Sequence, residues 1–175
     1  MCGFVVTTDT HNLKLMLKKQ QFRGPDNMSG RIDRGIGMGH VLLDINGEHQ
    51  VQPYKTSKGN YIVFNGEMYD TPIPNDTQYL AEGLETYGFQ FLAHNDWHGA
   101  LCWYNPEKRQ LIAVRDHFGA KPLWLQRKGT KFTFTTSLRS LLDVTPNKKL
   151  EKLFQINALL EGSESPYEDV VKLEP

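Results

Sequence analysis

Met1-Cys2-Gly3-Phe4-Val5-Val6-Thr7-Thr8 opens the chain, and the apolar and β-branched residues from Gly3 to Thr8 predict a β-strand. Cys2 therefore stands at the start of a strand, and removal of Met1 would give it both a thiol and a free α-amine. An α-amine has a pKa of about 7.7–8.0, so a useful fraction is a neutral base at physiological pH. A thiol next to its own base is an activated nucleophile, whereas the competing interpretation is a buried thiol at a strand edge.

A second candidate element, Phe64-Asn65-Gly66-Glu67, lies at the end of the apolar run Tyr61-Ile62-Val63-Phe64. Acyl transfer passes through a tetrahedral oxyanion, which hydrogen-bond donors stabilise. The Asn65 side-chain amide and the Gly66 backbone N–H can supply two such donors, since glycine permits a close approach. An ordinary Asn-Gly turn is the competing interpretation.

The rest of the sequence predicts strands and helices that occur in blocks. Apolar residues recur at helical spacing from Leu13 to Leu17, and Arg23-Gly24-Pro25-Asp26 ends that helix. The expected helices cover residues 11–21, a segment that begins at 75–78, residues 137–142 and residues 150–160. The expected strands cover residues 3–8, 35–45, 60–65, 100–104, 110–115, 123–126 and 131–135. Blocks of strands and helices, rather than strict alternation, favour an α+β fold.

The composition excludes several classes of function. The 175 residues allow one domain, or one domain with an appendage. Lys plus Arg and Asp plus Glu number 20 each, and the basic residues form no long run, which argues against a nucleic-acid-binding protein. No window approaches ~18 apolar residues and the amino-terminal segment lacks a signal-peptide pattern, so we expect a cytoplasmic protein that does not bind membranes.

The sequence also predicts no metal site and no cofactor. It contains no C-x-x-C, no H-E-x-x-H and no P-loop. His94 and His98 are interpreted as part of a solvated loop before a strand. Gly35-Ile36-Gly37-Met38-Gly39 lacks the final glycine of a dinucleotide-binding fingerprint. Cys102 lies in an apolar run, where a free thiol behaves as a small hydrophobic residue, so we expect no disulfide.

Six segments, in family order, resemble the class II glutamine amidotransferases, and in particular the glutaminase half of glutamine-dependent asparagine synthetases. These segments are Met1-Cys2-Gly3, Arg23-Gly24-Pro25-Asp26, Gly39-His40 with Leu43 and Ile45, Phe64-Asn65-Gly66-Glu67-Met68-Tyr69, Asn75-Asp76-Thr77, and Arg115-Asp116-His117-Phe118-Gly119-Ala120-Lys121-Pro122-Leu123. Such domains are amino-terminal-nucleophile hydrolases. The resemblance therefore implies a four-layer αββα sandwich over roughly residues 1–145.

The resemblance also implies roles for individual residues. Cys2 would be the nucleophile with its α-amine as general base, and Asn65 with Gly66 would form the oxyanion hole. Asp76, together with the region of Glu67, would hold the α-ammonium group of the substrate. Three further residues would have a structural role at the pocket, where they would form ion pairs and hold loops in place: Arg23, Arg115 and Asp116.

The third of these segments, from Gly39 to Ile45, departs from the family pattern. Leu42 stands where the family carries an arginine for the α-carboxylate of glutamine, in a substrate-binding stretch that also includes Ile45. A charged hydrogen bond of that kind contributes about 1.5–3 kcal/mol. Asp44 adds a negative charge to the same stretch. Either another cation such as Arg34 replaces the arginine, or the amide donor is not free glutamine, or the site has decayed.

Residues 1–145 are expected to form a glutaminase-like domain, and residues 146–175 a helical connector that resembles the linker to a synthetase domain absent from this sequence. The leading interpretation is a stand-alone glutaminase that acts on glutamine or a related amide and supplies ammonia to a separate ATP-dependent synthetase subunit. The alternatives are a binding or scaffold subunit with an impaired site, and an amidase whose donor lacks a free α-carboxylate.

Overall fold

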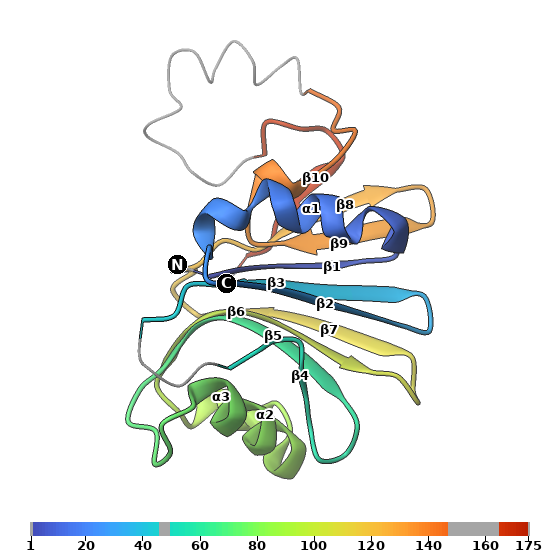
Figure 1. Ribbon diagram of the computed structural model, residues 1–175. Helices are drawn as coiled ribbons and strands as arrows, with labels where there is room; N and C mark the ends of the chain where they lie inside the picture. Colours follow the sequence, from blue (N-terminus) through green and yellow to red (C-terminus); the bar gives the residue numbers. More distant parts are fainter. Residues whose placement is uncertain (1, 46–49, 147–164, 175) are drawn as a thin grey trace.

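The computed structural model describes residues 2–45, 50–146 and 165–174, which build two antiparallel sheets (Figure 1). The six-stranded sheet has the order β10-β8-β9-β1-β3-β2, and the four-stranded sheet has the order β4-β5-β6-β7. The first sheet contains β1 (Gly3–Thr7), β2 (Asn27–Asp33), β3 (Ile36–Leu42), β8 (Trp124–Lys128), β9 (Lys131–Thr135) and β10 (Val170–Lys172). The second contains β4 (Tyr54–Lys55), β5 (Tyr61–Met68), β6 (Trp97–Asn105) and β7 (Gln110–Arg115).

The helices lie on the outer faces of the two stacked sheets. α1 (Leu13–Lys19) covers the six-stranded sheet, and α2 (Asp76–Tyr87) with α3 (Gln90–Ala93) covers the four-stranded sheet (Figure 1). Short 3-10 helices occur at Thr10–Asn12, Gln21–Arg23 and Leu138–Ser140. The order of layers is therefore α, β, β, α, which confirms both the α+β class and the four-layer sandwich.

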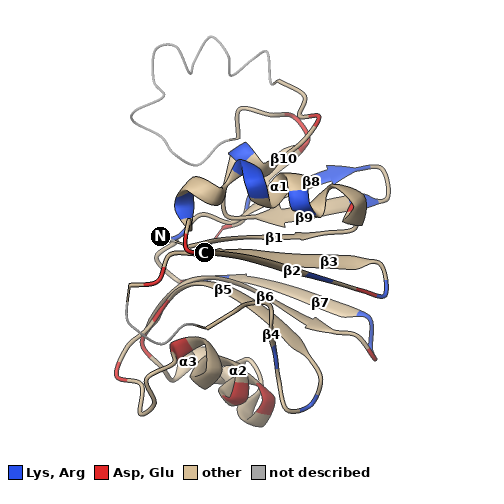
Figure 2. Cartoon of the chain, viewed as in Figure 1, with Lys and Arg blue, Asp and Glu red and all other residues tan. Residues whose placement is uncertain are grey.

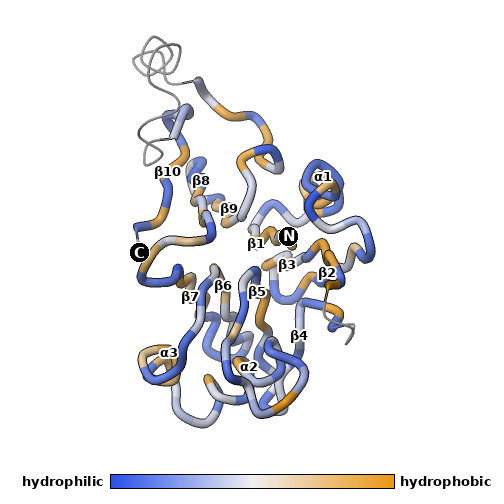
Figure 3. Tube along the Cα trace, turned by 90° about the vertical axis from the view of Figure 1, so that its left-hand side faces the viewer, coloured by the Kyte–Doolittle hydropathy of each residue, from blue (hydrophilic) through white to orange (hydrophobic). Residues whose placement is uncertain are grey.

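The apolar pattern of the central strands explains the stacking. In β1, Phe4 and Val6 join the core between the sheets, while Val5 packs in the cluster that contains α1. In β5, Val63 faces the core between the sheets and Phe64 faces the cluster under α2. Figure 3 shows the hydrophobic stretches along β1 and β5. Strands covered on both faces need apolar residues at consecutive positions, and this requirement is why both read as unbroken apolar runs.

The zero net charge conceals a segregation of charge between the outer layers. α1 contains three lysines and no acidic residue, whereas α2 contains Asp76, Glu82 and Glu85 and no lysine or arginine (Figure 2). The acidic Asp76 lies in the first turn of α2, where the partial positive charge of a helix amino terminus favours a carboxylate.

The structure differs from the sequence expectation at several elements. The expected helix 11–21 is α1 flanked by 3-10 turns, and the predicted inward residues Leu13, Met16 and Leu17 are buried. The expected helix 137–142 is only the 3-10 turn Leu138–Ser140, because the buried Ser140 hydroxyl bonds locally to the Ser137 carbonyl. The expected strand 35–45 ends at Leu42, since the chain leaves the sheet there.

The carboxyl-terminal segment contains a strand in place of an entirely helical connector. β10 pairs with β8, and the Leu173 N–H donates to the Leu123 carbonyl at 2.8 Å. The expected helix 150–160 lies outside the described residues. Among the helices of the described ranges, none has the length and apolar character needed to cross a bilayer.

Candidate active site

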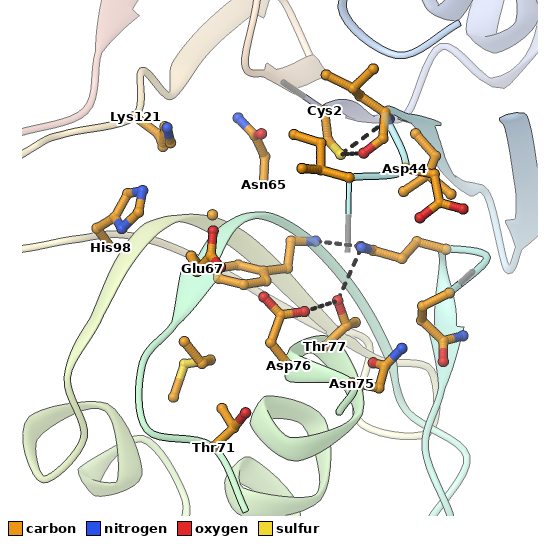
Figure 4. Close-up of a pocket in the computed structure, with 18 of the residues that line it drawn as sticks. Cys2, Asp44, Asn65, Glu67, Thr71, Asn75, Asp76, Thr77, His98 and Lys121 are labelled. Atoms are coloured by element: carbon orange, nitrogen blue, oxygen red, sulfur yellow. Dashed lines mark hydrogen bonds between the residues drawn. The ribbon is translucent and has the colours of Figure 1, made fainter. Parts of the chain in front are cut away.

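A cavity of about 420 Å³ opens where β1 begins, β5 ends and α2 starts (Figure 4). It is lined by seven of the residues singled out from the sequence: Cys2, Leu42, Ile45, Asn65, Gly66, Glu67 and Asp76. These residues come from segments far apart in the chain. The antiparallel pairing of β1 with β3 brings Cys2 opposite the end of β3, and β5 carries Asn65 in the facing sheet.

The Cys2 thiol is half-buried and is held by the backbone of Leu43. The Leu43 N–H donates to Cys2 Sγ at 3.4 Å, and the thiol donates to the Leu43 carbonyl at 3.6 Å. Burial raises the pKa of the Cys2 thiol, and Asp76 adds to that effect, while the Leu43 N–H and Arg23 oppose it. Arg23 Nε also donates to the Cys2 carbonyl at 3.0 Å. Because the net shift favours the neutral thiol, a nearby base is needed to form the thiolate.

The Asn65 side chain is a buried donor without an acceptor. Its exposed fraction is 2%, and its Nδ2 makes no hydrogen bond with any group in the described parts of the chain. Leaving such a donor unsatisfied costs about 1–3 kcal/mol. Figure 4 shows Asn65 projecting between Cys2 and Lys121. The arrangement leaves this donor available to an acceptor that enters the cavity.

Gly66 packs too closely against β6 to be any other residue. A Cβ added at Gly66 would overlap the His98 carbonyl oxygen and would lie 2.6 Å from the Gly99 Cα. The register places Asn65 opposite Ala100 and Gly66 opposite Gly99. The glycine therefore lets the end of β5 remain in the sheet while Asn65 faces the cavity.

Asp76 is connected to strand β5 through a relay of two side chains, those of Gln52 and Thr77. The Thr77 hydroxyl donates to Asp76 Oδ1 at 3.3 Å and accepts from Gln52 Nε2 at 3.2 Å. Gln52 Oε1 in turn accepts from the Phe64 N–H at 2.6 Å. Burial raises the pKa of Asp76, while the backbone N–H groups of Thr77 and Met68 partly oppose this. The relay fixes the position of Asp76 relative to β5.

Arg115 and Asp116 do not line the cavity but fix the loop beside it. Asp116 accepts from the N–H groups of Gly99, Phe118 and Ala120 at 2.9, 3.1 and 3.0 Å. Burial acts to raise the pKa of Asp116, but these donors outweigh it and lower the pKa. Arg115 Nε donates to the Lys121 carbonyl at 2.8 Å. Both side chains therefore bind backbone groups of the chain beside the cavity.

Other cavity residues were not anticipated. Arg34, considered as a replacement cation, lies in the turn between β2 and β3, where its Nη1 donates to the Pro106 carbonyl at 2.7 Å. The cationic side chain that lines the cavity in the described ranges is Lys121, and His98 lies near it. Lys121 belongs to the segment of residues 115–123 that resembles the family, but the sequence assigned it no role. Gln52 lies in a polar loop, and nothing in the sequence marked it as a site residue.

A family model and several known proteins are similar to this chain. The family described as a glutamine amidotransferase domain matches residues 1–73 and 72–175. Asparagine synthetase [glutamine-hydrolyzing] 1 of Bacillus subtilis is 27% identical over 184 residues, which cover 87% of this chain and 28% of that protein. Amidase chry2 of Gibberella zeae is 27% identical over 140 residues, which cover 69% of this chain and 21% of that protein. The chain thus spans less than a third of the length of these relatives.

A solved structure has a similar fold. Glutamine phosphoribosylpyrophosphate amidotransferase from B. subtilis superposes with a TM-score of 0.63 at 14% sequence identity. The match covers 80% of this chain and 42% of that chain. The similarity supports the sandwich architecture.

Proposed function

This chain belongs to the glutamine amidotransferase family as a class II domain, and we propose that it hydrolyses the side-chain amide of glutamine through a thioester on Cys2. Removal of Met1 frees the Cys2 α-amine, which takes the thiol proton. The thiolate attacks the amide carbon, and the developing oxyanion accepts hydrogen bonds from Asn65 Nδ2 and the Gly66 N–H. The C–N bond then breaks, the nitrogen takes the proton from the α-ammonium, and ammonia leaves. Water hydrolyses the thioester to give glutamate and the free thiol.

The observation that carries this proposal is the buried Asn65 amide that has no partner in the described residues and shares a cavity with Cys2. Polar groups buried in folded proteins are hydrogen-bonded with few exceptions. A buried donor without a described partner, in the same cavity as the proposed nucleophile, is suited to an anion that exists only during the reaction. Pre-positioned donors of this kind supply a large part of the catalysis of acyl transfer.

The rest of the cavity suits the amino-acid portion of the substrate. Asp76, at the end of the Gln52–Thr77 relay, would accept from the α-ammonium, with Glu67 nearby. Leu42 and Ile45 would contact the methylene groups. Arg23, Arg115 and Asp116 would act indirectly by holding Cys2 and the adjacent loop.

We also propose that the ammonia is used by a separate ATP-dependent synthetase subunit. In this view residues 1–145 form the glutaminase domain, and residues 146–175 form a connector whose strand β10 docks onto the first sheet. A scaffold subunit with no hydrolysis is the competing interpretation.

Intact-protein mass spectrometry tests the proposal directly. We expect the expressed protein to lack Met1 and to gain one adduct with 6-diazo-5-oxo-norleucine, a glutamine-like electrophile. Peptide mapping should place the adduct on Cys2 and not on Cys102. Processed protein that takes no adduct and releases no ammonia from glutamine would favour the scaffold interpretation.

The second candidate function is hydrolysis of an amide substrate that lacks a free α-carboxylate. Leu42 favours it, because this apolar side chain lines the cavity where the family pattern has an arginine. If glutamine is the donor, Leu42→Arg should lower KM for glutamine by about tenfold, because a charged hydrogen bond is added. The effect on kcat should be small, since the carboxylate is bound alike in the ground and transition states. Steady-state kinetics of wild type, Leu42→Arg and the neutral control Leu42→Met measure this change.

A substrate with a blocked α-carboxylate would give a different kinetic result. If wild type prefers the α-carboxamide of glutamine and Leu42→Arg loses activity on it, Leu42 is an apolar wall for a donor with a blocked carboxylate. The neutral control should then retain that preference.

A further inference from the structure

The active-site cavity has two chemically different ends. Asp76 and its relay lie at one end, and Lys121 with His98 lies at the other (Figure 4). Cys2 and Asn65, the groups that would act on the amide, line the same cavity. The proposed reaction on glutamine uses Asp76, Cys2 and Asn65 but gives no role to Lys121.

Lys121 is held in place by the loop while its ammonium remains available. Its carbonyl accepts from Arg115 Nε at 2.8 Å, and its N–H approaches Asp116 Oδ2 at 3.4 Å. Arg115 Nη1 also donates to the Leu173 carbonyl at 2.7 Å, which ties this loop to the carboxyl-terminal segment. The Lys121 Nζ forms no ion pair or hydrogen bond with any residue of the described ranges. A fixed backbone with an unpaired cation at a cavity wall is suited to an anionic group of a ligand.

The wall around Lys121 is ordered by a second pair of residues. His98 Nδ1 lies 2.7 Å from the Tyr69 hydroxyl, and the two rings stack with centroids 5.5 Å apart. His98 belongs to β6 directly opposite Glu67 of β5, so this end of the cavity continues the strand that carries Asn65. The space beside Lys121 is thus continuous with the oxyanion site.

We propose that the cavity accepts γ-glutamyl amides whose leaving amine carries a carboxylate, such as γ-glutamyl amino acids, and that Lys121 binds that carboxylate. This inference rests on the proposed function, because it uses the same nucleophile and the same oxyanion donors. It differs in the leaving group, which is an amino acid in place of ammonia.

The proposed roles of Cys2, Asn65 and Asp76 leave one direction for the departing amine. The tetrahedral carbon has four substituents: the Cys2 sulfur, the oxyanion, the acyl chain and the leaving nitrogen. With the sulfur at Cys2, the oxyanion at Asn65 and the acyl chain extended toward Asp76, the nitrogen must take the remaining direction. Lys121 and His98 line the same cavity, and in Figure 4 both lie beyond Asn65 from Cys2 and apart from Asp76.

The reaction balances with water as the only co-reactant. The Cys2 thiolate forms a bond to the γ-carbonyl carbon, and the C–N bond to the amino acid breaks. The departing nitrogen takes one proton from the α-ammonium of Cys2 and leaves as a free amino acid. Water then hydrolyses the thioester to glutamate and regenerates the thiol.

The test compares two substrates that differ in one charge, γ-glutamyl-glycine and γ-glutamyl-glycinamide. In processed wild-type protein we expect kcat/KM for γ-glutamyl-glycine to exceed that for the glycinamide by about tenfold to a hundredfold, the range of a charged hydrogen bond. Lys121→Met should reduce this ratio to about one, and Lys121→Arg should keep most of it. Lys108→Met is the matched control. It removes the same charge from an exposed lysine in the turn before β7, which is not among the residues that line the cavity.

The outcomes separate this inference from the proposed function. Hydrolysis of glutamine without a preference for γ-glutamyl-glycine over the glycinamide overturns the role of Lys121 and leaves the glutaminase intact. An unchanged ratio in a folded Lys121→Met protein, with native-like thermal unfolding, also overturns it. If neither glutamine nor a γ-glutamyl amide is hydrolysed, the proposed function itself fails.

Discussion

Replacement of Cys2 by alanine should reduce ammonia release from glutamine by ~10⁴-fold or more, because in the proposed mechanism the Cys2 thiolate forms the covalent intermediate. The fold should persist, since Cys2 is half-buried at the position before β1, its described side-chain hydrogen bonds are the two weak ones to Leu43, and its backbone bond from Arg23 is kept in alanine. A coupled assay for ammonia, together with urea unfolding, measures both effects.

Cys102→Ala is the matched control for this experiment. Cys102 is fully buried in the core between the sheets, so its truncation should cost about 1 kcal/mol of unfolding free energy and leave the chemistry at Cys2 unchanged. Ammonia release by Cys2→Ala at the wild-type rate would show that the nucleophile lies elsewhere.

Replacement of Asn65 by alanine should lower kcat by roughly 10²–10³-fold with little change in KM, as expected when one oxyanion donor is removed. The same variant should be no less stable than wild type, because the Asn65 Nδ2 has no partner in the described structure and its burial is unfavourable. A loss of activity without a loss of stability distinguishes a catalytic donor from a structural one.

Asn60→Ala provides the comparison for Asn65. Asn60 precedes β5, and its Nδ2 donates to Glu85 Oε1 at 2.7 Å. Its removal should therefore destabilise the fold and leave kcat near the wild-type value. If Asn65→Ala instead raised KM alone, Asn65 would position the substrate rather than stabilise the oxyanion.

The residues of the candidate site could be predicted from sequence because several motifs occur together in the order of a known family, although each motif alone also had an ordinary structural interpretation. Cys2 at the start of a strand and Asn65-Gly66 at the end of another pointed to a nucleophile and an oxyanion hole, and the structure brings both to one cavity. The α+β class followed from strands and helices that occur in blocks, and the apolar runs of β1 and β5 identified two of those strands. The four-layer sandwich was implied by the family resemblance.

Other features depend on tertiary contacts that leave no local pattern. β2 was missed because it is an edge strand whose residues are exposed or half-buried, so no apolar alternation marks it. The link from Gln52 through Thr77 to Asp76 joins a loop to a helix, and neither end suggests the other in the sequence. Lys121 gained significance only when the loop fixed by Asp116 placed it at the cavity.

The two cysteines differ in accessibility, so in the folded protein Cys2 is the thiol that an external reagent can reach. Burial raises the pKa of Cys102, whose side chain is 0% exposed, while Cys2 opens onto the cavity. An alkylating probe applied under native conditions should therefore label Cys2 first, and the amount of label gives the number of accessible Cys2 thiols without a substrate. The Cys102 thiol can react only when the two sheets separate. Its slower labelling rate in the same sample therefore measures the rate at which the whole fold opens.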